Sequence, residues 1–383
     1  MVRCLSCLAL SLLLGVTGCT SRTSAKQDPS PSSSIAIAAN PEAQDAARFL
    51  AGVPGRADGP LHDLESSQDW RDHAHDFARI WTRFETVRQP RLRDFQKAEL
   101  NAEAFRTETL FYPFGGPDIL TASQLFPHQK TYVLVGLEPP GTVPDAAAIR
   151  SAHLERYLPR LRFTLESVFR RSFFVTADMD KQLRGQITDG VAPLLLVQLG
   201  RLGATIKGAE SVMLDEQGMV RKRTPDAPRR NAGVAFDFTF AGESQPRRLM
   251  YFSLNLSDKP LAENRAFQAF LATRKPVATF FKSASYLPHR KDFALIREVV
   301  LANSSAVLQD DTGIPYRYID RGVWNVQLYG DYTRPYGSFR NMVQPDLKRA
   351  FEEKGENVHP LPFYLGYGYG RAPSTLLAFR KKS

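Results

Sequence analysis

The apolar positions of this chain recur at two spacings, one typical of helices and the other of buried strands. Between Trp70 and Val87 the large apolar residues return every three or four positions, and Ser66 or Ser67 precedes them as a candidate helix cap. This spacing predicts an amphipathic helix. A second apolar run, Val191–Leu199, is too short for the roughly 20 residues of a membrane-spanning helix. It predicts a buried helix or strand.

A strand, a turn, a helix and a second strand are predicted further along. Leu110–Phe114 is a short apolar run that suits a buried strand, and Ile119–Phe126 has helical spacing. Thr131–Leu137 is another strand-like run, so the segment predicts a βαβ unit. The turn Gly115-Gly116-Pro117-Asp118 precedes the helix, and Glu138 stands 22 residues beyond Gly116. Nucleotide-binding folds place an acid at about that distance for ribose hydroxyls. The alternative is a plain tight turn and a solvated strand end.

Strands and helices continue to alternate towards the C-terminus. We expect strands near Leu249–Leu256, Ala278–Phe281 and Ala306–Gln309, helices at Glu263–Ala272 and Phe293–Ala302, and a closing antiparallel hairpin from Phe363–Tyr369 and Thr375–Phe379. The predicted fold class is therefore α/β, with a mostly parallel, Rossmann-like sheet. This α/β domain is expected over residues 107–383, after a helical cap over residues 41–106.

The first 40 residues have a different composition from the rest. From Thr20 to about Asn40 the chain is rich in Ser, Thr, Pro and Ala, and it lacks the apolar surface that would offset the entropy of ordering. We expect a flexible tether there. Ahead of it, Arg3 precedes an apolar run from Leu8 to Val16, and the run ends in Val16-Thr17-Gly18-Cys19.

This start resembles the signal of bacterial lipoproteins, in which the tetrapeptide is the lipobox. The resemblance implies that residues 1–18 are a signal peptide, that Cys19 is lipidated, and that residues 19–40 tether the body to a lipid bilayer. It also implies a place in the bacterial cell envelope. Thr20 rather than Asp after Cys19 implies the outer membrane, facing the periplasm. An ordinary cleaved signal and an uncleaved anchor are the alternatives.

The body resembles class I S-adenosylmethionine-dependent methyltransferases. Residues 110–138 are similar to the first two motifs of that family, Leu249–Leu256 to its fourth strand, and the closing hairpin to its terminal hairpin. The resemblance implies a Rossmann-like fold. It implies little about activity, because Gly115-Gly116-Pro117 replaces the family's Gly-x-Gly and proline removes an amide donor. An exported domain also lacks the cytoplasmic cofactor pool, so no cofactor is expected. The body is also similar to uncharacterised bacterial lipoproteins that share short sequence motifs such as Gly136-Leu137-Glu138-Pro139. This resemblance implies no activity.

Cysteine content and charge narrow the chemistry. The three cysteines are Cys4, Cys7 and Cys19, so the mature body would have no disulfide, no thiolate metal site and no cysteine nucleophile. The chain carries a net charge of +10, and removal of the signal peptide takes away Arg3 and no acid, which leaves +9. Such a charge favours an anionic envelope glycan or lipid as a partner. An exported protein is not expected to bind nucleic acid.

Polar residues follow several predicted strands, and an open α/β sheet places its site at the carboxyl ends of its strands. Asp118, Glu138, Asp310 and Asp311 could serve as paired acids or hold a hard cation such as Ca²⁺. Asp310 and Asp311 are equally good turn residues. Lys282 beside Ser283 could form a Ser-Lys nucleophile, although the chain has no Gly-x-Ser-x-Gly elbow.

Two further segments carry candidate binding residues. Residues 316–340 interleave aromatic rings with guanidinium groups that suit sugars and anionic head groups, among them Tyr316, Arg317, Arg321 and Arg334. Because Trp324, Val326 and Leu328 alternate like a half-buried strand, part of this segment is expected to be core. His73-Ala74-His75-Asp76 could hold a metal with Asp69 or Asp72. Two histidines two positions apart point away from each other, so a solvated helix face without metal is expected.

The sequence therefore predicts an envelope lipoprotein whose body binds a glycan, a lipid head group or a protein partner. Gly115, Gly116 and the arginines and tyrosine named above are the candidate ligand-binding residues. An envelope hydrolase that uses the strand-end carboxylates is the second hypothesis, and a methyltransferase-like enzyme is the third.

Overall fold

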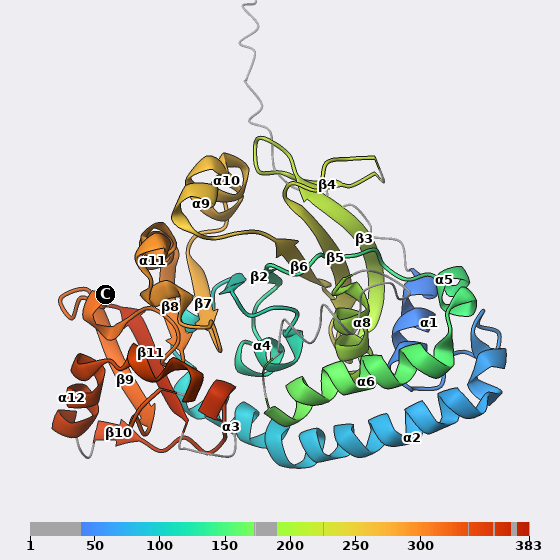
Figure 1. Cartoon of the computed structure of the whole chain (residues 1–383), viewed down its shortest axis with the longest axis horizontal. Helices are drawn as coiled ribbons and strands as arrows, with labels where there is room; N and C mark the ends of the chain where they lie inside the picture. Colours follow the sequence, from blue (N-terminus) through green and yellow to red (C-terminus); the bar gives the residue numbers. More distant parts are fainter. Residues whose placement is uncertain are drawn as a thin grey trace, which may run out of the picture. The chain divides into compact units, whose positions relative to one another are not determined.

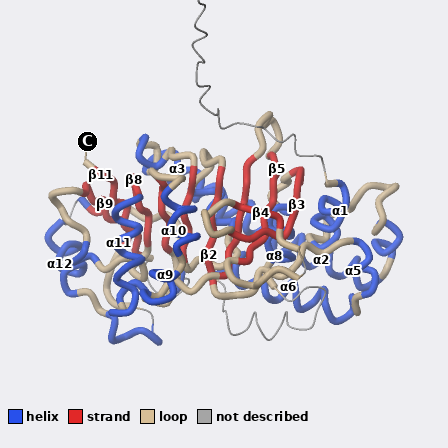
Figure 2. The backbone as a smooth tube through the Cα atoms, turned by 90° about the horizontal axis from the view of Figure 1, so that it is seen from above, coloured by secondary structure: helices blue, strands red, loops and turns tan. Residues whose placement is uncertain are grey.

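Most of the predicted strands join strands that were not predicted in one mixed sheet of eleven strands. Figure 2 shows the strands side by side. The order along the sheet is β10-β9-β11-β8-β7-β1-β2-β6-β5-β3-β4. The strands are β1 (Thr109–Pro113), β2 (Thr131–Gly136), β3 (Thr205–Leu214), β4 (Val220–Lys222), β5 (Ala232–Thr239), β6 (Arg247–Ser253), β7 (Val277–Phe281), β8 (Ser304–Gln309), β9 (Trp324–Gly330), β10 (Val358–His359) and β11 (Thr375–Lys381).

This computed structural model describes residues 40–171, 173, 190–224, 226–335, 337–354, 357–368 and 374–382. The predicted signal peptide, Cys19 and nearly all of the tether lie outside the described residues. Ile37–Ser383 forms one compact unit, distinct from Met1–Ala36, and it contains every core residue described below. We therefore expect residues 37–383 to fold without the preceding segment.

Five neighbouring strands, β6, β2, β1, β7 and β8, run parallel. Numbered by their appearance in the chain, they have the spatial order 3-2-1-4-5, which is that of Rossmann-like sheets. This confirms the predicted α/β fold with a Rossmann-like sheet. The direction in which strands are added reverses between β1 and β7, so the topological switch point lies between these two strands.

Two details of the predicted sheet are wrong. Leu249–Leu256, expected as the fourth strand, contributes to β6, which pairs with β2 and holds the third position. β5 pairs antiparallel with the other edge of β6, so β6 lies inside the sheet. The predicted closing hairpin fails because Phe363–Gly368 is a loop with a short 3-10 turn. β11 instead pairs antiparallel with β8 and β9.

The helices cover both faces of the sheet (Figure 1). They are α1 (Pro41–Leu50), α2 (Gln68–Arg83), α3 (Gln89–Glu99), α4 (Ile119–Leu125), α5 (Ala146–Ser151), α6 (Leu154–Arg171), α8 (Ala192–Arg201), α9 (Asp258–Glu263), α10 (Arg265–Ala272), α11 (Ala294–Asn303) and α12 (Pro345–Lys354). The run Val191–Leu199 is therefore a buried helix, α8. No helix in the described part of the chain has the length and apolarity needed to cross a membrane.

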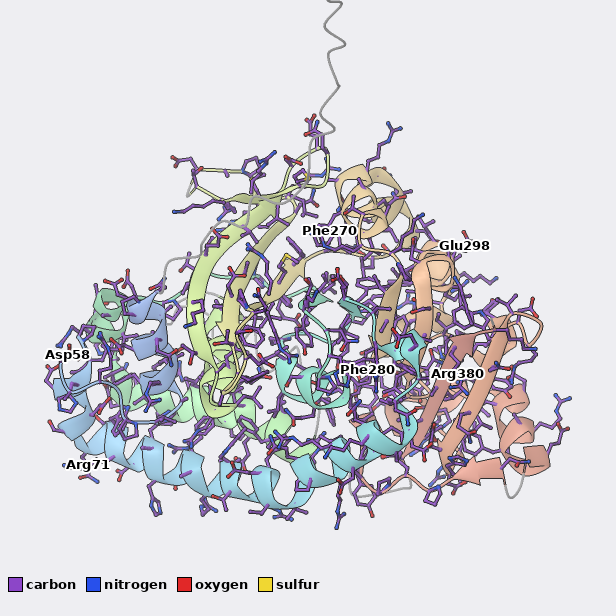
Figure 3. The ribbon with its side chains drawn as sticks, turned by 180° about the vertical axis from the view of Figure 1, so that it is seen from behind. Asp58, Arg71, Phe270, Phe280, Glu298 and Arg380 are labelled. Atoms are coloured by element: carbon purple, nitrogen blue, oxygen red, sulfur yellow. The ribbon has the colours of Figure 1, made fainter. Side chains whose placement is uncertain are left out.

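Alternating side chains of the parallel strands build a core on each face. Tyr112 and Phe280 point into the core shared with α1, α2, α4, α6 and α8, whereas Phe111 and Phe281 point into the core shared with α10 and α11. Phe280, labelled in Figure 3, packs its ring 4.6 Å from that of Tyr112. Burial on both faces explains why these strands appear in the sequence as continuous apolar runs.

The predicted amphipathic helix is α2, which lies beside α6 (Figure 1). The Oγ of Ser67 accepts a hydrogen bond from Trp70 N at 3.3 Å, so Ser67 is the cap. The prediction that His73 lies on a solvated face is wrong. His73 is fully buried, and its Nε2 lies 2.9 Å from the carbonyl oxygen of Leu50. His75, two positions on, is exposed.

His73 makes stability depend on pH. Burial lowers the pKa of His73 from its usual 6.5 to about 4. The unfolded chain therefore binds a proton more readily than the folded chain between these values. As the pH drops from 6.5 to 4, we expect the protonation of His73 to lower the free energy of unfolding by about 3 kcal/mol. In His73→Gln this part of the pH dependence should be absent. Urea titrations at several pH values measure it, and an unchanged pH profile in His73→Gln would rule it out.

Candidate ligand site at the strand ends

A cavity of about 610 Å³ opens at the carboxyl ends of four parallel strands, β1, β2, β6 and β7. The switch point between β1 and β7 is where an open α/β sheet is expected to bind its ligand. The loops after these strands supply most of the wall, together with η7 (Gly337–Met342) and η9 (Gly366–Gly368). Among the sequence candidates, Gly115, Gly116, Glu138, Lys282 and Ser283 line this cavity.

The backbone around this cavity is strained. Five non-glycine residues of the described chain have a positive φ, and four of them lie in the loops after β1 and β7. They are Phe114 (61°), Ser283 (53°), Ser285 (51°) and Tyr286 (52°). A bulky residue in this region is unfavourable, and such strain is concentrated at functional sites. Three of the four, all except Tyr286, line the cavity.

Gly115 and Gly116 shape the loop after β1. Gly116 has a φ of 58°, which glycine adopts at little cost. A Cβ on Gly115 would stand 2.1 Å from the ring of Tyr112, so the glycine lets this loop lie against a buried aromatic ring. The two glycines form a tight turn after β1, and they also line the cavity.

Glu138 lies at the end of β2, half-buried in the cavity wall. The hydroxyl of Tyr251, on the neighbouring strand β6, donates to Glu138 Oε2 at 3.0 Å. A Cβ on Gly136 would come within 2.5 Å of that oxygen, so the glycine makes room for this pair. No described residue donates a hydrogen bond to Oε1, which leaves this oxygen available to a ligand.

Asp118 and Lys282 form a buried ion pair behind the cavity. Each side chain is about 1% exposed, and Lys282 Nζ donates to Asp118 Oδ2. Asp118 also caps α4 by accepting from Thr121 N at 3.0 Å, and it accepts from the hydroxyl of Tyr112. Burial lowers the pKa of Lys282, and the charge of Asp118 opposes that effect. The Lys282 amine is therefore turned to Asp118, and no described contact joins it to Ser283.

Asp310 and Asp311 form the turn that their sequence allowed. Asp310 is buried, and its carboxylate accepts hydrogen bonds from the backbone N of Thr312 (3.0 Å) and of Ser283 (2.8 Å). The hydroxyl of Tyr286 donates to Asp311. Burial and the nearby charge of Asp310 raise the pKa of Asp311 to about 7. Neither acid lines the cavity, so neither shares it with Glu138 as a catalytic pair.

Ser283 links this turn to the cavity. Its backbone N is held by Asp310, and its carbonyl oxygen accepts from the hydroxyl of Tyr367 at 3.0 Å. The buried Oγ of Ser283 has no hydrogen-bond partner among the described residues. A buried hydroxyl without a partner is costly, so Ser283 is a further unfavourable feature of this loop.

The tyrosine and arginine segment lies elsewhere. Trp324, Tyr329 and Tyr332 are core residues, in agreement with the strand prediction. Arg321 stacks 3.9 Å from the ring of Tyr316, and the four binding candidates Tyr316, Arg317, Arg321 and Arg334 do not line the cavity. Of the described residues of this segment, Ser338 and Phe339 line the cavity.

Several wall residues were not predicted. Leu254 and Leu256 follow β6 directly, so the same strand-end argument could have found them. Tyr367 and Phe339 come from segments far along the chain, and no local pattern marks them. Their rings stack at 5.4 Å with an angle of 28° between their planes.

No group of three or more His, Asp or Glu residues in the described ranges is placed to hold a metal ion. Comparisons with protein-family models, with curated proteins and with solved structures find no match to this chain. The chemistry of the cavity is therefore inferred from its own geometry.

Proposed function

We propose that this protein is a lipoprotein of the bacterial cell envelope, anchored through Cys19, whose body binds the hydroxyl-rich part of a glycan in the strand-end cavity. The observation that carries the proposal is the coincidence of a cavity of about 610 Å³ with the switch point of the sheet and with strained backbone. A largely preformed concave site is what a small-molecule ligand needs.

The wall chemistry favours a ligand with many hydroxyl groups. Aromatic rings of Phe114, Phe339 and Tyr367 offer faces on which a sugar ring can stack. Glu138 offers a carboxylate oxygen, and the exposed Ser285 offers a hydroxyl. Carboxylate and hydroxyl groups exchange hydrogen bonds with sugar hydroxyls.

The charge of the wall argues against an anionic ligand in this cavity. Glu138 is the carboxylate of the wall, and the amine of Lys282 is paired with Asp118. An anionic lipid head group would therefore meet a negative charge, and no cation other than the paired Lys282 lines the cavity among the described residues. A neutral glycan meets no such penalty.

The hydrolase hypothesis has weaker support. Paired acids must both reach the substrate, and of the four carboxylates only Glu138 lines the cavity. Asp118 and Asp310 are occupied in buried hydrogen bonds that hold the loops. These contacts favour roles in shaping the site.

Glu138→Gln tests the proposal directly. It keeps the size of the side chain but removes its charge and half of its acceptor capacity, so we expect binding of envelope oligosaccharides to weaken about tenfold. Saturation-transfer NMR and calorimetry on residues 37–383 measure the change. Glu108→Gln, at a solvent-exposed carboxylate outside the cavity, is the matched control. Equal affinity in the wild type and Glu138→Gln would argue against this site.

A further inference from the structure

A second cavity, of about 640 Å³, lies where the end of α2 and the start of α3 meet α6 and the segment Phe363–Tyr364. We name it the arginine pocket, because Arg79, Arg83, Arg88 and Arg91 all line it. Its floor contains the rings of Phe84, Phe169 and Phe363. It shares no lining residue with the strand-end cavity.

A π-helical turn, Phe84–Arg88, brings the four arginines to one side. Arg79 and Arg83 are four residues apart before the turn, and Arg88 and Arg91 are three apart after it. These are the spacings of one helix face. Arg83 and Arg88 are five apart, which matches the i→i+5 repeat of a π-turn. The extra residue of the π-turn therefore keeps both arginine pairs facing the pocket. Such π-turns are frequent at functional sites.

The pocket carries an excess of positive charge. Among the described residues, four guanidinium groups line it against one carboxylate, that of Glu166. Arg79 lies 3.8 Å from Asp76, but Asp76 is closer to Arg162, at 3.1 Å. In the described part of the chain no carboxylate pairs with Arg83 or Arg91, and Arg91 donates only to the carbonyl oxygen of Pro362.

The pocket also has apolar surface that a simple anion would not need. Val87 and Tyr364 are 48% and 50% exposed at its wall, above the buried rings of Phe84 and Phe169. Arg88 is buried and donates to the carbonyl oxygen of Val168, which fixes the end of α6 to the π-turn. Cationic and apolar groups therefore converge on one preformed hollow.

We propose that the arginine pocket binds an anionic amphiphile through a phosphate group, as in an anionic phospholipid. The phosphate lies against Arg83 and Arg91, since guanidinium groups match phosphate oxygens with paired hydrogen bonds. The first carbons of the apolar chains cover the aromatic floor. This site is separate from the glycan cavity and does not depend on it.

The test is calorimetry on residues 37–383 with three probes. They are dihexanoyl phosphatidylglycerol, which is anionic, dihexanoyl phosphatidylcholine, which is zwitterionic, and inorganic phosphate, with both lipids below their micelle concentrations. We expect the anionic lipid to bind at least tenfold more tightly than either other probe. Arg83→Gln and Arg91→Gln should each weaken it about ten- to a hundredfold, and added salt should weaken it further.

Two controls separate binding from folding. Arg71→Gln removes an exposed arginine from the same helix outside the pocket, and Glu138→Gln alters the other cavity; both should leave lipid binding unchanged. Thermal unfolding verifies that each variant is folded. Equal binding of both lipids, or full binding by Arg83→Gln and Arg91→Gln, would overturn the proposal. If inorganic phosphate bound as tightly as the anionic lipid, the proposal that the ligand is an amphiphile would be overturned, and the pocket would be a site for simple anions.

Discussion

Replacing Asp118 by alanine is expected to lower the free energy of unfolding by about 3–5 kcal/mol, because it leaves Lys282 buried without its counter-charge. The pair is almost completely excluded from water, so the lysine cannot recover its hydration without opening the core behind the cavity. The variant also loses the cap of α4 and the acceptor for the Tyr112 hydroxyl.

Chemical denaturation of residues 37–383 measures this loss. Glu108→Ala is the matched control, since it breaks the Lys130–Glu108 pair, in which the side chains are 68% and 77% exposed. That change should cost no more than about 1 kcal/mol. The double variant Asp118→Leu with Lys282→Met should recover much of the loss, because it removes both charges. A loss below about 1 kcal/mol in Asp118→Ala would contradict the buried pair.

Gly115→Ala is expected to destabilise the fold by about 1–3 kcal/mol and to weaken ligand binding in the strand-end cavity. The new Cβ would stand 2.1 Å from the Tyr112 ring, which is fully buried and packed against Phe280. Either the ring or the loop must move, and the loop is part of the cavity wall.

A double-mutant cycle with Tyr112→Val identifies the cause. Once the ring is absent, Gly115→Ala should cost much less, because the two changes act on one contact. Gly337→Ala serves as the control, since a Cβ there meets open space. If the losses of unfolding free energy from the two changes are additive, contact with the Tyr112 ring is not the reason why position 115 needs glycine.

The parallel strands were predictable because burial on both faces leaves a clear pattern. β1, β2, β7 and β8 each appear as a short apolar run, and the helices between them keep helical spacing. The position of β6 was not predictable in the same way. It depends on the parallel pairing of β6 with β2, which joins residues 117 positions apart in sequence, such as Thr131 and Arg248.

The candidate site was predictable only where it follows a strand. Glu138, Lys282 and Ser283 were found because they come directly after β2 and β7. Their partners were not, since Tyr251 is 113 residues from Glu138 in sequence and Tyr367 is 84 residues from Ser283. His73 is a different case, because it lies three residues after Trp70 and four before Phe77, and this helical spacing places it on the buried face of α2. The periodicity of the sequence therefore indicated the direction of His73, but it does not indicate the long-range contacts of Tyr251 and Tyr367.

The central claim, that the strand-end cavity is a ligand site, is tested most directly by native mass spectrometry. Residues 37–383, exported to and purified from the protein's own envelope, are compared with Glu138→Gln prepared in the same way. We predict a bound species of the mass of a small glycan on the wild-type protein that is lost or strongly reduced in Glu138→Gln. Wild-type protein that is consistently empty, or a species retained equally by both proteins, would contradict the claim.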